Sequence, residues 1–146
     1  MAFADLRQEQ LPALARIEHL AFAGSVDARV FPELLQSPQA CLRAWARTKR
    51  DFDPRTSLVL MRGAEPVGFV RAAGARGVAT IDCVAVLPEF RGGVGRALML
   101  EALRRMREHR YQVALLSVTA ENTTALTLYE RLGFREVGWS ISIYRR

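Results

Sequence analysis

The segment Val84–Leu98, VAVLPEFRGGVGRAL, decides how this chain folds. Its apolar, β-branched start predicts a buried strand over Val78–Val86, which Pro88 closes. After the glycines, apolar residues recur at four-residue spacing among arginines, which predicts an amphipathic helix of about four turns beginning near Val94. A strand, a glycine turn and a helix in this order bring together free backbone N–H groups and the positive end of the helix dipole. The segment therefore predicts a phosphate-binding turn.

The glycine spacing excludes two common nucleotide loops. A Walker A loop needs the string GxxxxGK[ST], which this chain lacks. A dinucleotide-binding loop needs a third glycine at the position where this chain has Leu98. A glycine turn required only for tight packing explains the same residues, and at this point that alternative stays open.

The elements around this segment predict one α/β domain with a mixed sheet. Ser37 and Pro38 have the residue types of an N-cap and a first helical position. Two extended segments separated by a Gly-Ala-Glu-Pro turn predict a hairpin. Helices are expected over 11–21, 94–106 and 125–132, and over a segment that begins at 38 and is ended by residues 51–54. Strands are expected over 57–61, 67–70, 78–86 and 112–118, with one or two more within 134–144.

Composition limits the class of protein. The 146 residues suit a single domain, expected to span 1–146, and no apolar stretch approaches the about 20 residues that cross a bilayer. No leader precedes the first helix, so we expect a cytoplasmic protein without membrane contact. Cys41 and Cys83 lack CxxC spacing, which predicts buried thiols and no metal site. The net charge of +6 is spread along the chain, which favours an acidic small ligand but not nucleic acid.

A second motif follows the strand expected over 112–118. It consists of Asn122 and the run LYERLGF from Leu128 to Phe134. Separately, Asn122 is explained as an N-cap, Tyr129 as a half-buried aromatic and Gly133 as a C-cap. Together with VAVLPEFRG and GVGRAL, however, the motif resembles the GNAT acetyltransferase superfamily, over residues 57–140.

The resemblance implies a GNAT fold: a mixed central sheet of about six to seven strands, helices on both faces, and a splayed strand pair that holds coenzyme A. In such a fold the backbone at Val84, Ala85 and Val86 would bind the pantetheine arm, and Asn122 and Tyr129 would contact the cofactor near its thioester. The loop around the pyrophosphate would consist of Arg91, Gly92, Gly93, Val94, Gly95 and Arg96.

The implied activity is transfer of an acetyl group from acetyl-CoA to a primary amine by direct attack, with Tyr129 protonating the departing thiolate. The acceptor stays open between a small molecule and a protein lysine or N-terminus, and a homodimer stays open as well. Thr80 and Ser117 occupy positions where family members often carry a glutamate base. Asp82 is therefore the candidate catalytic base, with a water relay or external deprotonation as alternatives. The missing glutamate also leaves a non-catalytic acyl-CoA sensor as the alternative function.

The loop is one residue shorter than the family pattern, in which Gln or Arg precedes the first glycine by three positions. Here Arg91 stands two positions before Gly93, so either one residue is missing or Phe90 takes the first position. We expect that one N–H donor to the pyrophosphate is lost or repositioned, which affects CoA affinity without changing the fold.

Overall fold

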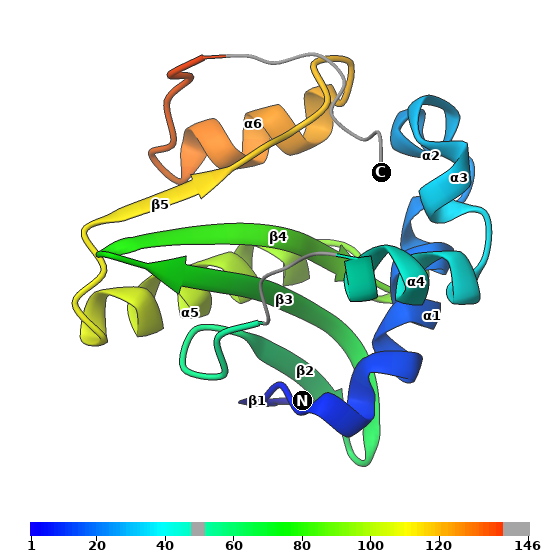
Figure 1. Cartoon of the computed structure of the whole chain (residues 1–146), viewed down its shortest axis with the longest axis horizontal. Helices are drawn as coiled ribbons and strands as arrows, with labels where there is room; N and C mark the ends of the chain where they lie inside the picture. Colours follow the sequence, from blue (N-terminus) through cyan, green and yellow to red (C-terminus); the bar gives the residue numbers. More distant parts are fainter. Residues whose placement is uncertain (48–51, 139–146) are drawn as a thin grey trace.

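A five-stranded sheet forms the centre of the described part of the chain, with helices on both faces (Figure 1). The structure is a computed structural model that describes residues 1–47 and 52–138. The strands, in their order across the sheet, are β1 (Ala2–Asp5), β2 (Leu58–Arg62), β3 (Glu65–Ala75), β4 (Val78–Val86) and β5 (Val113–Leu116). The helices are α1 (Leu11–Phe22), α2 (Val26–Val30), α3 (Pro32–Leu35), α4 (Pro38–Arg47), α5 (Val94–Glu108) and α6 (Thr123–Arg131), with 3-10 turns η1 (Gln8–Gln10) and η2 (Pro88–Phe90).

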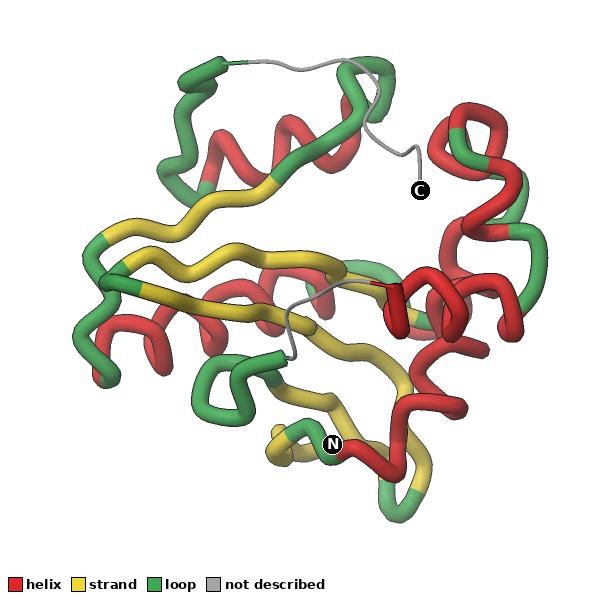
Figure 2. Tube along the Cα trace, in the orientation of Figure 1, coloured by secondary structure: helices red, strands yellow, loops and turns green. Residues whose placement is uncertain are grey.

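The sheet is mixed, as the sequence predicts. β1 to β4 are antiparallel neighbours, and β5 runs parallel to β4. A parallel neighbour needs a crossover connection, and α5 supplies it (Figure 2). The predicted hairpin is confirmed as β2 and β3, and the predicted strand over Val78–Val86 is β4.

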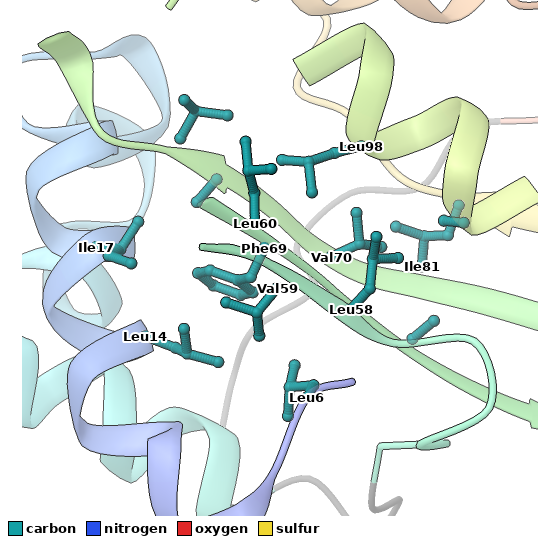
Figure 3. Close-up of a cluster of buried hydrophobic side chains, with 14 of the residues drawn as sticks. Leu6, Leu14, Ile17, Leu58, Val59, Leu60, Phe69, Val70, Ile81 and Leu98 are labelled. Carbon is teal, nitrogen blue, oxygen red and sulfur yellow. The ribbon is translucent and has the colours of Figure 1, made fainter. Parts of the chain in front are cut away.

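Two hydrophobic layers hold the helices against the sheet. On one face, the ring of Trp45 in α4 meets Phe69 of β3 edge to face, with centroids 5.7 Å apart. Figure 3 shows Phe69 on the side of Leu14 in α1 and Leu98 of α5 on the other side of the strands. A Cβ atom at Gly68 would lie 3.1 Å from a methyl carbon of Leu98, so this glycine lets α5 approach the sheet closely.

Local capping explains where two helices begin. The hydroxyl of Ser37 accepts a hydrogen bond of 3.0 Å from the amide of Ala40, and Pro38 opens α4, as predicted. The side chain of Asn122 caps α6 by accepting from the amide of Ala125 at 3.2 Å. Gly133 follows α6 with a φ of +99°, the conformation of a C-terminal cap.

Several expectations differ from the structure. β1 and the short helices α2 and α3 were not expected, because segments of four or five residues carry too little periodicity to register. β5 is shorter than the strand expected over 112–118. No strand occurs over 134–138, and the rest of the range expected for the last strands lies outside the described residues. The described part of the chain thus has five strands, whereas about six to seven were expected.

The described residues contain no helix with both the length and the apolar character needed to span a membrane. Both cysteines are free thiols; Cys41 is buried, as expected, whereas Cys83 is only partly buried.

Tyr111 holds the start of β5 against the end of β3. Its hydroxyl donates to Oδ2 of Asp53 at 2.7 Å and accepts from Nη2 of Arg55 at 3.2 Å. A Cβ atom at Gly74 would lie 2.2 Å from this hydroxyl oxygen, so the ring crosses β3 where only glycine fits. Burial opposes ionisation of Asp53, but hydrogen bonds from Tyr111 and Arg55 outweigh it and lower its pKa.

We predict that Tyr111→Phe lowers the free energy of unfolding by about 1 kcal/mol at pH 7, because the partly buried carboxylate of Asp53 loses a hydrogen bond. Urea denaturation measures the difference. Because the pKa of Asp53 is lowered in the folded state, its stabilisation is complete above the unfolded pKa and lost as pH falls, so the difference should shrink below about pH 4. Equal stability of the two proteins at pH 7 would contradict this role.

Candidate active site

β4 and β5, the edge strand of the sheet, separate midway along β4. They pair only between Val78–Ile81 of β4 and Val113–Leu116 of β5, although β4 continues to Val86. In Figure 1, β5 turns away from β4 toward α6. The segment Val84–Val86 pairs with β3 on its other edge, and no strand among the described residues covers the edge facing β5. Backbone groups along such an edge can bind an extended ligand as another strand would.

A β-bulge lies where the two strands separate. Arg71 pairs with Cys83 and Ala72 with Ile81, which leaves Asp82 as an extra residue in β4. The carboxylate of Asp82 forms an ion pair of 3.4 Å with Nη1 of Arg71, a side chain only 4% exposed. This arrangement disfavours Asp82 as a proton acceptor, because a neighbouring guanidinium stabilises the unprotonated carboxylate.

The glycine loop before α5 closes through two consecutive left-handed residues. Gly92 has a φ of +108° and Gly93 a φ of +92°, and Gly93 is the N-cap of α5. A Cβ atom at either position would meet nothing within 4 Å. Backbone conformation therefore requires these glycines, whereas the alternative of tight packing does not hold for them.

The N-terminus of α5 is open to an anion. Gly93 has no side chain to cap the helix, and the amides of Val94, Gly95 and Arg96 precede the first intrahelical bond, from Ala97 to the carbonyl of Gly93. The surface beside the two left-handed glycines is open. A pyrophosphate therefore fits here by charge, by hydrogen-bond donors and by space.

The two arginines of the loop differ in position. The guanidinium of Arg91 donates from Nη2 to the backbone carbonyl of Ala21, near the end of α1. Arg96 is exposed on the first turn of α5. The side chain of Arg91 thus connects the loop to α1, while that of Arg96 faces solvent.

Tyr129 lies on α6 with its ring edge against Phe134, at a centroid distance of 5.9 Å. Burial, together with the neighbouring Cys83 and Asp27, raises the pKa of Tyr129 to about 12. The phenol therefore keeps its proton at neutral pH, which is the form that a proton donor needs.

Asn122 joins two elements through its amide. Its Oδ1 caps α6, and its Nδ2 donates to Oδ2 of Asp27 in α2 at 3.1 Å. The interpretation of Asn122 as an N-cap is confirmed, and both ends of its side chain are engaged in this conformation.

The comparison with protein families fits this geometry. The model of the acetyltransferase (GNAT) family matches residues 16–134, most of the chain. This chain belongs to the GNAT family. The splayed strands, the glycine loop and α6 all lie within the matched region.

Curated relatives of this GNAT chain are longer. The mycothiol acetyltransferase of Thermobispora bispora is 34% identical over 133 residues, which are 84% of this chain and 44% of that protein. The mycothiol acetyltransferase of Streptomyces scabiei is 40% identical over 86 residues, 57% of this chain and 28% of that protein. The chain therefore spans less than half the length of these relatives.

Solved structures share the GNAT fold. The ribosomal-protein-S18-alanine N-acetyltransferase of Escherichia coli aligns with a TM-score of 0.71 and 26% identity, over 94% of this chain and 79% of that one. The PaiA N-acetyltransferase of Thermoplasma acidophilum, solved with coenzyme A, aligns with a TM-score of 0.69 over 92% of this chain and 89% of that one. Its 19% identity shows the fold alone.

The structure adds Asp27 to the residues around Tyr129 of this GNAT chain. The hydroxyl of Thr119 donates to Oδ1 of Asp27, and Asn122 donates to Oδ2. Asp27 thereby links α2 to the turn that follows β5. Sequence reasoning missed it because an acidic residue in a first helical turn is ordinarily a local, solvated charge.

Glu18 of α1 is the second residue that sequence reasoning missed. Burial raises its pKa to about 7, although the thiol of Cys83, the indole of Trp45 and the charge of Arg71 all act to lower it. Its Oε2 atom is buried and has no hydrogen-bond partner in the described part of the chain. One signal was present in the sequence: Glu18 stands four residues after Leu14, on the apolar face of the helix.

Another hollow, of about 450 Å³, lies at the C-terminal end of α5. Arginines and acidic side chains, among them Asp5 and Glu108, line it. It contains none of the candidate residues of the GNAT site, so we place no chemistry there.

Proposed function

We propose that this GNAT chain transfers the acetyl group of acetyl-CoA to a primary amine by direct attack. The observation that carries the proposal is one arrangement: the edge of β4, which no strand among the described residues covers, lies between the open glycine loop and Tyr129. The family and the names of the relatives support acetyl transfer.

Each part of acetyl-CoA has residues that suit it. Backbone groups of Val84, Ala85 and Val86 bind the pantetheine arm along the edge of β4. The loop from Arg91 to Arg96, with the first turn of α5, holds the pyrophosphate. This assignment leaves the thioester near Tyr129 and Asn122.

Aminolysis of a thioester needs a neutral amine, stabilisation of the oxyanion and a proton for the leaving thiolate. Backbone N–H groups at Val84 and Val86 serve the oxyanion, and Tyr129 donates the proton. Direct attack is favoured over a covalent acetyl-cysteine, because burial and the neighbouring Glu18 raise the pKa of the Cys83 thiol well above its usual value.

The acceptor is a cationic amine in this proposal. Two carboxylates, Asp27 and Glu18, lie around Tyr129 and Cys83 on the side of the N-terminal helices. An acidic surrounding attracts an ammonium group. The names of the relatives point to two acceptor classes, a small thiol-bearing molecule and an alanine of a ribosomal protein.

Calorimetry with acetyl-CoA, followed by a thiol-release assay with amines, tests the proposal. The amines are deacetylated mycothiol, a peptide with N-terminal alanine, a lysine peptide and an aminoglycoside. We expect acetyl-CoA to bind and at least one amine to release CoA thiol, with its acetylation seen by mass spectrometry. Binding without release from any amine would identify an acyl-CoA sensor, and failure to bind any CoA thioester would overturn the assignment of the site.

A further inference from the structure

We propose that Glu18 accepts the proton that the acceptor ammonium loses before it attacks the thioester. This inference rests on the proposed acetyl transfer. It assigns a base to a site in which the two usual glutamate positions hold Thr80 and Ser117.

The position of Glu18 supports this role. Its carboxylate interacts with the Cys83 thiol on β4, and the same thiol acts electrostatically on Tyr129. Cys83 directly follows the bulge at Asp82, where β4 and β5 have separated. The proposed proton acceptor and proton donor therefore both act on one side chain, next to the backbone of Val84, which would face the thioester in the proposed complex.

The groups around Glu18 leave its carboxylate able to accept a proton. The titratable groups that face it are Cys83 from β4, Cys41 from α4 and Arg71 from β3, and Trp45 of α4 offers an indole N–H. Arg71 is the only cation among these four groups, and Asp82 already pairs with it at 3.4 Å.

Oε2 of Glu18 is buried without a hydrogen-bond partner among the described residues. An unpartnered carboxylate oxygen in a buried position is costly to the fold and is typical of functional sites.

The basicity of Glu18 follows from the same burial. Burial raises the pKa of Glu18 to about 7, close to the pH at which a general base is most effective. An ordinary glutamate is too weak a base for an ammonium, and Asp82 is held by Arg71. Of the carboxylates near Cys83, Glu18 has the environment of a base.

Every proton in the proposed acetyl transfer is accounted for. One proton passes from the acceptor ammonium to the Glu18 carboxylate, which leaves a neutral amine. The amine nitrogen forms the C–N bond as the C–S bond breaks, and the thiolate takes the phenolic proton of Tyr129. The second nitrogen proton returns to the Tyr129 phenolate, and Glu18 releases its proton to solvent when the acetylated product leaves.

The test is the pH dependence of kcat/KM for the wild type and Glu18→Gln, with two active amines whose own pKa values differ. A limb of the pH–rate profile that reflects ionisation of the enzyme lies at the same pH for both amines, whereas a limb that reflects ionisation of the amine shifts with the pKa of that amine. We expect a wild-type decrease below about pH 7 for both amines. In Glu18→Gln this limb should disappear and turnover should fall by about a hundredfold, with acetyl-CoA affinity unchanged.

Thermal stability separates catalysis from a structural role. The raised folded-state pKa means that Glu18 favours the fold below its unfolded pKa, and that this contribution is lost as pH rises through about 7. Glu18→Gln should therefore melt at a higher temperature than the wild type at pH 8, and the difference should shrink at pH 5. A glutamate whose charged form stabilises the fold would give the opposite, a lower melting temperature of the variant at pH 8.

Two control variants complete the experiment. Glu18→Asp keeps a carboxylate, so it should retain part of the turnover and the decrease in kcat/KM at low pH. Glu9→Gln removes an exposed carboxylate and should behave as wild type. If Glu18→Gln keeps the wild-type turnover and pH–rate profile, or if it loses acetyl-CoA affinity, the role of Glu18 is overturned while the proposed function stands. A wild type that acetylates no amine would overturn the proposed function, and this inference with it.

Discussion

Gly93→Glu is expected to abolish acetyl-CoA binding, with a loss of affinity of at least about a hundredfold. The substitution places a carboxylate at the N-cap of α5, where the pyrophosphate would bind. Two negative groups competing for the same amides and the same helix dipole repel each other, and each tenfold loss of affinity corresponds to about 1.4 kcal/mol. The fold should persist, because an added Cβ meets nothing within 4 Å and a left-handed residue costs only about 1–2 kcal/mol.

Calorimetry with acetyl-CoA measures this loss, and circular dichroism confirms the fold. Gly63→Glu is the matched control, because Gly63 also has a positive φ, +60°, and open space around it, but lies in the turn between β2 and β3. Gly93→Ala separates backbone strain from charge and should weaken binding only modestly. Retained affinity in Gly93→Glu would remove the loop from the cofactor site.

Tyr129→Phe is expected to lower turnover by about tenfold to a thousandfold, with acetyl-CoA affinity nearly unchanged. The variant keeps the aromatic ring and its contact with Phe134 but removes the proton that the thiolate needs. Because the pKa of Tyr129 is raised to about 12, the wild-type phenol stays protonated across the range in which the enzyme can be assayed.

Steady-state kinetics and calorimetry measure the two parts of this result. Tyr111→Phe is a natural comparison, because it removes a tyrosine hydroxyl outside the site and should lower stability without lowering turnover at 25 °C. Unchanged turnover in Tyr129→Phe would take Tyr129 out of the mechanism. A parallel loss of acetyl-CoA affinity would instead assign it to binding.

Much of the fold could be predicted because its signals are local. The start of α4 follows from Ser37 and Pro38, and the strand Val78–Val86 follows from its own apolar residues and the closing proline. The pairing of β1 with β2 could not be predicted, because four residues at the edge of a sheet gain their structure from a partner far away in the chain.

Some features of the candidate site could likewise be predicted from local motifs, and others could not. The glycine loop, Asn122 and Tyr129 belong to compact motifs, and their spacing alone indicates where a cofactor would bind. Even so, the local pattern did not reveal that Asn122 reaches Asp27, or that Arg91 reaches the carbonyl of Ala21. Those contacts join residues widely separated in the chain.

The sequence by itself determined most of the longer strands and helices, the glycine turn before α5 and the family, since each depends on residues within a few turns or strands of one another. Only the tertiary structure decided which charges are buried. The sequence places Glu18 on the apolar face of its helix, but only the packing of α1 and α4 against β3 and β4 shows that Oε2 of Glu18 and the side chain of Arg71 are buried. The electrostatic behaviour of a carboxylate depends on that surrounding and not on its neighbours in sequence, so the base proposed for this site became visible only in the folded chain.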